Sequence, residues 1–187
     1  MDLVSRAKQI LMDPKSEWQV IKSEEATVGS LFTQYAVILA AIPPIAGLIG
    51  NSFMLHLGMN FAIQTAVVQY VVNLLGVYVM AFIIDILAPN FGSNKDMVAS
   101  LKVVVYAYTA SWVGGILMIV PAIGWLGSLA GGIYSLYLLY LGLQSVKNTP
   151  QDKLMTYTVV SIIAAIVVSM VIGGIVAAVI IRQAFFM

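Results

Sequence analysis

The segment that decides the fold is "AGGIYSLYLLYLGLQSVKNTP", residues 130–150. It starts with small residues, continues through tyrosines and leucines, and reaches its first charged side chain only at Lys147. Similar apolar runs recur along the chain, and about 20 such residues make a helix long enough to cross a bilayer. Only 9% of all residues are charged and 61% are hydrophobic, whereas roughly a quarter of a soluble domain is charged. The sequence therefore predicts an integral membrane protein.

Five apolar runs predict an all-α fold, an integral membrane bundle of five transmembrane helices. The third and fourth runs are joined by "PAIG", residues 121–124, and a link this short predicts an antiparallel hairpin. Pro43 and Pro44 lack backbone donors and should kink or break the first span. An odd number of spans puts the two termini on opposite sides. The predicted transmembrane domain is 31–187, with spans at about 31–50, 61–88, 98–120, 125–145 and 154–181.

Residues 1–30 are predicted to form a short, amphipathic, cytoplasmic helical segment. Residues 1–12 place apolar side chains at helical spacing, and Asp13-Pro14 supplies a cap and a first-turn proline for a second helix. Trp18 and Ile21 share one face of this helix. We expect that face at the membrane interface or at the mouth of the bundle, with Trp18 as an anchor at the headgroup level. The alternative is a solvated tether, because helices this short are marginal alone.

The orientation follows from the distribution of Lys and Arg, which favour the cytoplasmic side. With the N-terminus inside, eight basic residues flank the inner ends of the spans and one flanks the outer ends. We therefore expect the N-terminus in the cytoplasm, available to a protein partner, and the C-terminus outside. The inner residues are Arg6, Lys8, Lys15, Lys22, Lys95, Lys102, Lys147 and Lys153, and the outer one is Arg182.

Several kinds of function lack their sequence signals. The chain has no Cys and a net charge of +1, so thiolate chemistry is absent and no basic patch predicts nucleic-acid binding. Its one histidine, His56, has no carboxylate neighbours and predicts no metal site. No motif of a hydrolase, a phosphate-binding loop or a membrane protease is present. We expect no cofactor and no enzymatic activity, and the first 30 residues are too charged for a signal peptide.

Asp85 is the one acid within an apolar span, and a carboxylate in hydrocarbon is costly unless it is paired or hydrated. It lies near the inner end of the second span, and Lys102 lies near the inner end of the third. The first interpretation is structural. Either Asp85 and Lys102 form an ion pair, or their charged groups extend to the hydrated membrane interface. The second is a proton or ion site.

Two amides, Gln69 and Asn73, lie one helical turn apart near the middle of the second span. Amides at this depth usually form hydrogen bonds between helices. The alternative is that they line a polar cavity.

Small residues recur at four-residue spacing in the last two spans, which allows helix backbones to approach closely. The fourth span has two such rows, one with Gly127, Gly131 and Ser135 and its neighbour with Ser128 and Gly132. The fifth repeats the pattern with Ser169 and Gly173. These rows predict packing within one bundle or between subunits, hence a possible homo-oligomer. The alternative is that the small residues line a path or leave room for a lipid.

Three stretches give the chain a resemblance to a known family: "DPKSEWQVIKSEE", "YAYTASWVGGILMIVPAIGWLG" and "IYSLYLLYLGLQSVKNTPQDK". Together with the five-span layout they resemble the bacterial branch of the YIP (Ypt-interacting protein) family. The resemblance implies a prokaryotic inner-membrane protein with a cytoplasmic N-terminus. Eukaryotic relatives act in vesicle trafficking alongside small Rab-type GTPases, but the cytoplasmic Asp-Leu-Tyr-Gly-Pro signature of those relatives is absent here.

Two kinds of function are compatible with these sequence features. One is a non-enzymatic bundle that binds partners or bilayer lipids and organises the membrane. The other is a small-solute or ion pathway, because discontinuous helices build sites at mid-membrane depth. A hydrated cavity that reaches both Asn73 and Asp85 would favour the second.

Overall fold

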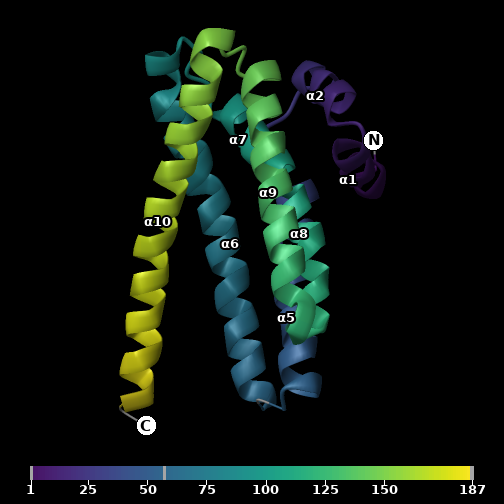
Figure 1. Cartoon of the computed structure of the whole chain (residues 1–187), viewed down its shortest axis with the longest axis vertical. Coiled ribbons are helices and arrows are strands. Elements are labelled where there is room, and N and C mark those ends of the chain that lie inside the picture. The colour runs from purple at the N-terminus through teal and green to yellow at the C-terminus, as the bar shows by residue number, and fades with distance from the viewer. Residues whose placement is uncertain (1, 57, 186–187) are drawn as a thin grey trace.

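The computed structural model describes residues 2–56 and 58–185, and this part of the chain is helical in five long segments preceded by two short helices (Figure 1). The predicted fold class is confirmed, because five segments are long and apolar enough to cross a membrane. These segments are Val28–Met54, Met59–Phe91, Met97–Ile119, Pro121–Ser145 and Gln151–Val171.

The elements follow one another along the chain without a strand in the described residues. They are α1 (Leu3–Met12), α2 (Pro14–Ser23), α3 (Val28–Leu31), η1 (Phe32–Ala36), α4 (Val37–Leu39), α5 (Ile42–Ile49), η2 (Gly50–Met54), α6 (Met59–Leu87), η3 (Ala88–Phe91), α7 (Met97–Ala107), α8 (Thr109–Gly114), η4 (Gly115–Ile119), α9 (Pro121–Ser145) and α10 (Gln151–Phe185).

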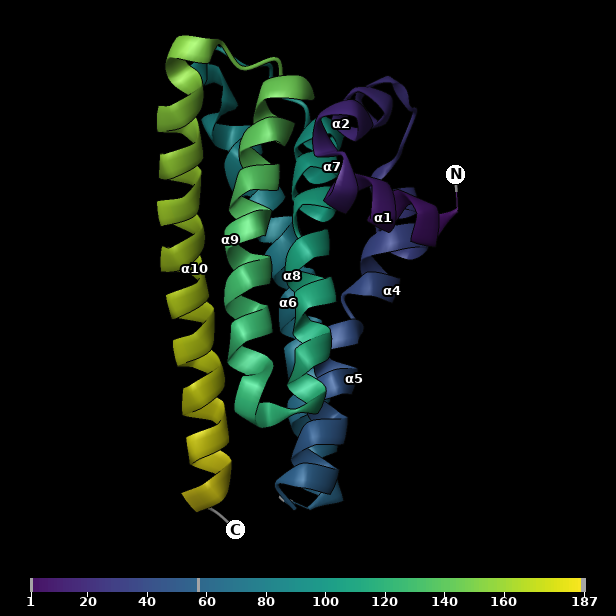
Figure 2. The same ribbon diagram turned by 45° about the vertical axis from the view of Figure 1, so that its right-hand side comes forward.

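The two ends of the bundle differ in composition. One end carries α1 and α2, the loop at 92–96 and the loop at 146–150 (Figures 1 and 2); we call it the charged end. The eight basic residues predicted for one side of the membrane belong to elements and loops at this end. The opposite end carries the end of η2 and the start of α6 (Figure 1). Across the bundle, α10 packs against α6 and α9, while α8 and α9 form the predicted hairpin.

The first span is broken, as Pro43 and Pro44 predict. The helix α4 ends at Leu39, and α5 begins at Ile42 with the two prolines in its first turn. Neither proline has the N–H that would continue the helical ladder. The facing element η4 leaves room for the bend at Gly115, where an added Cβ would lie 2.6 Å from the Cγ atom of Pro43.

A carbonyl released by this break is satisfied from another helix. The backbone N–H of Ala41 turns to the carbonyl of Ile38, so the carbonyl of Val37 lacks its usual helical donor. The hydroxyl of Tyr70, on α6, donates a hydrogen bond of 2.9 Å to that carbonyl. Such repairs allow prolines within transmembrane helices.

The α8–α9 hairpin is closed by one of the two small-residue rows. An added Cβ at Gly131 would lie 2.5 Å from the carbonyl oxygen of Ala110, and one at Gly127 would collide with the backbone of Gly114. The next residue of the row, Ser135, receives a hydrogen bond of 3.1 Å from the backbone N–H of Ser111. The residues of this row therefore pack against α8 of the same chain.

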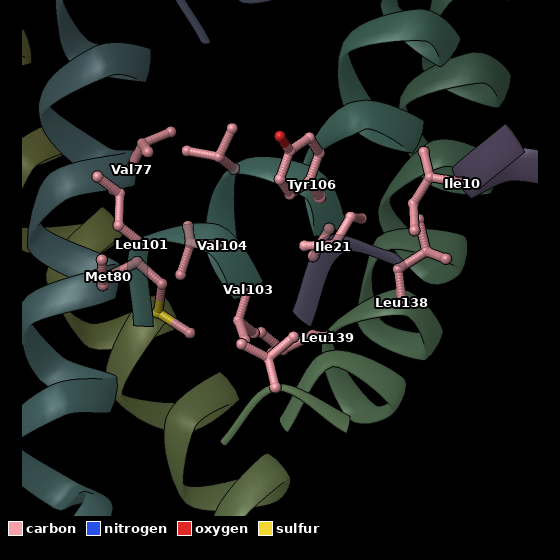
Figure 3. Packing of buried hydrophobic residues seen from close by; sticks show 14 of the residues in the cluster. Ile10, Ile21, Val77, Met80, Leu101, Val103, Val104, Tyr106, Leu138 and Leu139 are labelled. Atoms are coloured by element: carbon pink, nitrogen blue, oxygen red, sulfur yellow. The ribbon is translucent and has the colours of Figure 1, made fainter. Parts of the chain in front are cut away.

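The apolar core lies towards the charged end, where α2 packs on α9 and α1 packs on α2 and α8. Figure 3 shows Ile10 and Ile21 of these two helices among buried side chains of α7 and α9. Trp18 is 0% exposed, and its ring lies 2.9 Å from the position of an added Cβ at Gly142. It also meets the ring of Tyr106 edge-on, with centroids 6.3 Å apart. The expected headgroup anchor at Trp18 must therefore be corrected: protein, and not lipid, covers this side chain. The burial of Trp18 agrees with a position of this helix face at the mouth of the bundle, and it does not agree with a solvated tether.

Candidate functional site

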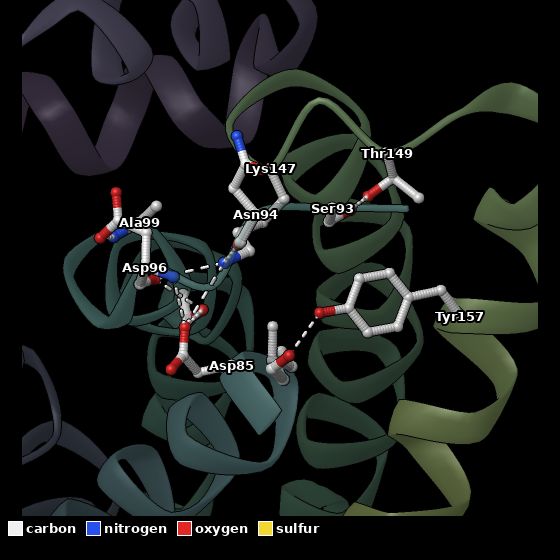
Figure 4. Close-up of polar contacts among 10 residues, drawn as sticks. Asp85, Ser93, Asn94, Asp96, Ala99, Lys147, Thr149 and Tyr157 are labelled. Atoms are coloured by element: carbon white, nitrogen blue, oxygen red, sulfur yellow. Dashed lines mark hydrogen bonds and ion pairs between the residues drawn. The ribbon is translucent and has the colours of Figure 1, made fainter. Parts of the chain in front are cut away.

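Asp85, near the end of α6, is the centre of a buried polar cluster (Figure 4). Its Oδ1 atom accepts hydrogen bonds from the backbone N–H of Asp96 at 2.6 Å and from the Ser100 hydroxyl at 3.2 Å. The ammonium of Lys147 lies 3.6 Å from the same oxygen. Lys147 also donates to the carbonyls of Asn94 at 2.7 Å and Asp96 at 3.2 Å. This cluster joins the end of α6 to both loops of the charged end.

The predicted ion pair between Asp85 and Lys102 is wrong, because Asp85 pairs with Lys147 instead. Lys147 follows α9, and the turn into α10 brings it over the end of α6. Burial lowers the pKa of the Lys147 ammonium, and the negative charges of Asp85 and Asp96 oppose that effect. The sequence signal that was missed is the position of Lys147 directly after a span that ends on the same side as α6.

Lys102 instead holds the N-terminal helices. Its ammonium donates to the carbonyl of Ile21 at 3.0 Å and to that of Glu24, which lie at the end of α2. A cation at a helix C-terminus satisfies free carbonyls and complements the helix dipole.

Arg6 completes this attachment from α1. Its guanidinium forms ion pairs with Glu17 and Glu24 of the second helical segment, and it lies 5.8 Å from the centre of the Tyr106 ring on α7. Burial acts to lower the pKa of Arg6, but its bond to Glu24 and the charge of Glu17 outweigh burial, so the net shift is upward. We call Arg6, Glu17, Glu24 and Lys102 the N-terminal clamp.

A cavity of about 370 Å³ lies at mid-bundle depth, and we call it the midspan cavity. It is bounded by α5, α6, α8, η4, α9 and α10. Gln69 and Asn73, the two predicted amides, both line it. The other lining residues are Pro43, Val72, Gly76, Met80, Ile83, Tyr108, Ser111, Trp112, Gly115, Met118, Ser128, Ala165, Val168, Ser169 and Gly173.

A second space of about 400 Å³, the side pocket, adjoins the midspan cavity between α6, α9 and α10. The two spaces share Met80, Tyr108, Ala165 and Ser169. The remaining lining of the side pocket is mostly apolar and comprises Ser135, Leu136, Leu139, Ile162, Ile166 and Met170. Several of these, including Leu136, Ile166 and Met170, are exposed on the outer surface, so the side pocket opens towards the bilayer.

The small residues outside the hairpin contact face open space. An added Cβ at Gly132 or Gly173 would meet no described atom within 4 Å. Ser128 and Ser169 line the midspan cavity. Within one chain, therefore, the second row of α9 and the small residues of α10 do not form a close helix contact among the described side chains.

The described residues bring together no group of three or more His, Cys, Asp or Glu side chains that would hold a metal ion. The midspan cavity lies apart from the charged clusters, and its polar lining consists of amides, hydroxyls and the indole of Trp112. Such groups bind a ligand by hydrogen bonds.

Comparisons with known proteins identify relatives of this chain. The family model described as "Yip1 domain" matches residues 8–180. The "Inner membrane protein YohC" of Escherichia coli K12 is 30% identical over 160 residues, which cover 78% of this chain and 80% of that protein. The protein of the same name in Escherichia coli O6:H1 gives the same values. No solved structure matches the chain.

Proposed function

This chain belongs to the Yip1 family and is a multi-pass inner-membrane protein, and from that premise we propose that it is a non-enzymatic protein that binds bilayer lipids or membrane partners and thereby organises the membrane. The observation that carries the proposal is the midspan cavity with its lateral side pocket. Combined, the two spaces have the size and the mostly apolar walls of a small-molecule site. Their opening towards the bilayer favours a ligand that arrives from the membrane.

The alternative function is a small-solute or ion pathway. It would gain support from a cavity that reaches both Asn73 and Asp85. The midspan cavity is lined by Asn73 but not by Asp85. The carboxylate of Asp85 forms an ion pair with Lys147 and accepts two hydrogen bonds from other groups. We therefore prefer binding to transport.

The test of the proposed function fills the cavity. Gly76 lines it, and an added Cβ there meets nothing within 4 Å, so Gly76→Phe should occupy the space without disturbing a helix contact. Gly174→Phe is the matched control, because an added Cβ at Gly174 also meets open space and Gly174 lines neither the midspan cavity nor the side pocket. Native mass spectrometry of protein purified from membranes should show bound lipid on the wild type and the control, and several-fold less on Gly76→Phe. Equal lipid on all three folded proteins would contradict the proposal.

The orientation is part of the same proposal, with the N-terminus in the cytoplasm and the C-terminus outside. It is supported by the gathering of eight of the nine basic residues at the charged end. Reporter fusions after residues 56, 95, 123, 150 and 187 should read outside, inside, outside, inside and outside. A fusion after residue 95 or 150 that reads outside would reverse the orientation.

A homo-oligomer is proposed through the second small-residue row of α9. The row with Gly131 is used within one chain, whereas Gly132 faces open space. A small residue beside open space allows close approach of another helix, and a two-fold dimer is the commonest assembly. A wild-type protein that stays monomeric in nanodiscs at a high protein-to-lipid ratio would contradict this.

A further inference from the structure

The midspan cavity contains polar side chains that the protein does not satisfy. Gln69, Asn73 and Tyr108 line it, and their side-chain polar groups form no hydrogen bond with another described residue. Neighbouring polar groups of the same bundle are paired, as Tyr70 is with Val37 and Ser111 with Ser135. At mid-membrane depth an unpaired amide costs free energy. These three side chains therefore have the capacity to bind a polar group from outside the protein.

The charge of the lining restricts what that group is. Among the described residues that line the midspan cavity or the side pocket, none is charged. A charged headgroup would enter this low-dielectric space without a counter-ion, which is strongly unfavourable. The site therefore selects a neutral group.

The hydrogen-bonding chemistry restricts it further. Each amide both donates and accepts, and so does the Tyr108 hydroxyl. A hydroxyl group, which also donates and accepts, satisfies such a set in any orientation. The side pocket continues from these residues along the apolar side chains of Leu139, Ile162 and Ile166, which suit a hydrocarbon chain.

We propose that the midspan cavity and the side pocket together hold one neutral lipid with a free hydroxyl group, such as a diacylglycerol. Its hydroxyl meets Gln69 and Asn73, and one acyl chain lies in the side pocket. This inference rests on the proposed function and names the ligand class of the same site. The occupant is a lipid and not a second protein helix, because the two spaces of about 370 and 400 Å³ match a small-molecule site.

A tryptophan in the cavity wall makes the proposal measurable. Trp112 lines the midspan cavity, whereas Trp18 is fully buried away from both spaces. Trp125 is 62% exposed on the outer surface and would report any bilayer lipid, so the Trp125→Phe variant of the full chain is the starting protein. In nanodiscs of phosphatidylethanolamine and phosphatidylglycerol, quenching by added diacylglycerol with brominated chains then reports contact with Trp112.

Brominated diacylglycerol should quench this fluorescence at several-fold lower mole fraction than phosphatidylcholine or phosphatidylglycerol with the same brominated chains. Gln69→Leu and Asn73→Leu should each weaken that response about three- to tenfold, as expected for a lost membrane hydrogen bond. The matched control is Gln64→Leu, because Gln64 is an exposed amide of α6 that does not line the cavity. The thermal midpoints of Gln69→Leu and Asn73→Leu without diacylglycerol should not fall, since the amides are unpaired.

The outcomes separate this inference from the proposed function. Equal quenching by diacylglycerol and the brominated phospholipids overturns the selection of a neutral hydroxyl lipid but leaves lipid binding in place. No quenching by any brominated lipid overturns both. Full quenching in Asn73→Leu and Gln69→Leu overturns the assignment of the hydroxyl to these amides. If a variant does not fold, the comparison of lipids on the starting protein still decides the question.

Discussion

The charged end and the mid-bundle region place polar groups in opposite situations. At the charged end, Asp85 accepts two hydrogen bonds and forms an ion pair with Lys147. In the N-terminal clamp, Arg6 is paired with two carboxylates and Lys102 donates to backbone carbonyls. Around the midspan cavity, Gln69 and Asn73 have no described partner. A buried ion without a partner is far more costly than an unpaired amide. The buried charges at the charged end must therefore find their partners within the protein. The mid-bundle region can instead be completed by a ligand.

The largest effect should distinguish the two faces of α9. Gly131→Leu forces a side chain into the backbone of Ala110 and should prevent folding, whereas Gly132→Leu meets open space and should yield folded protein. Size-exclusion chromatography in detergent and thermal unfolding give the readout. If the second row joins two subunits, Gly132→Leu should be a folded monomer where the wild type is not. A folded Gly131→Leu protein would show that the hairpin is not closely packed.

A smaller loss is expected from the buried ring at the charged end. Trp18→Ala removes a fully buried side chain and should lower the free energy of unfolding by about 3–5 kcal/mol. Trp18→Phe keeps most of the packing and loses only an indole N–H that has no hydrogen-bond partner among the described residues, so it should cost much less. Thermal unfolding of both variants would check the order. Equal stability of Trp18→Ala and the wild type would mean that the N-terminal helices are not anchored by this side chain.

The next prediction concerns the ion pair and uses a double-mutant cycle. Asp85→Asn and Lys147→Met should each destabilise the protein, and the double variant should lose less than the sum by on the order of 1–3 kcal/mol, because contacting residues couple. The control cycle replaces Lys147→Met with Lys102→Met. Its effects should add to those of Asp85→Asn, since Lys102 binds carbonyls of the second helical segment and not Asp85. Coupling in the control cycle alone would restore the pair that the sequence predicted.

The smallest effect is expected where a polar group repairs the broken first span. Tyr70→Phe removes the donor to the Val37 carbonyl and should cost about 0.6 kcal/mol and at most about 1.7 kcal/mol, the average and the maximum found for hydrogen bonds between membrane helices. Tyr78→Phe is the control, because Tyr78 is an exposed tyrosine of the same helix. A Tyr70→Phe loss no larger than that of the control would show that this carbonyl is satisfied in another way.

The sequence predicted the spans and the break well, but it assigned partners poorly. Pro43 and Pro44 lack an N–H wherever the chain goes, so the interruption of the first span is a local property. The partner of Asp85 is not local, because several lysines, Lys102 and Lys147 among them, lie at the same end of the bundle. The turn after α9 decides between them by placing Lys147 over α6. Trp18 was misplaced for a similar reason, since an amphipathic face does not say whether lipid or protein will cover it.

What the sequence alone determined was the membrane location, the five helical spans and the gathering of positive charge at one end. These follow from hydrophobicity, proline chemistry and charge summed along the chain, which need no knowledge of neighbours. Only the tertiary structure decided which row of α9 is closed by α8, where Trp18 is buried and which polar groups remain unpaired around the midspan cavity. The reason is that each of these depends on the distance between residues far apart in the chain, and helix periodicity assigns a residue to a face without naming what that face meets.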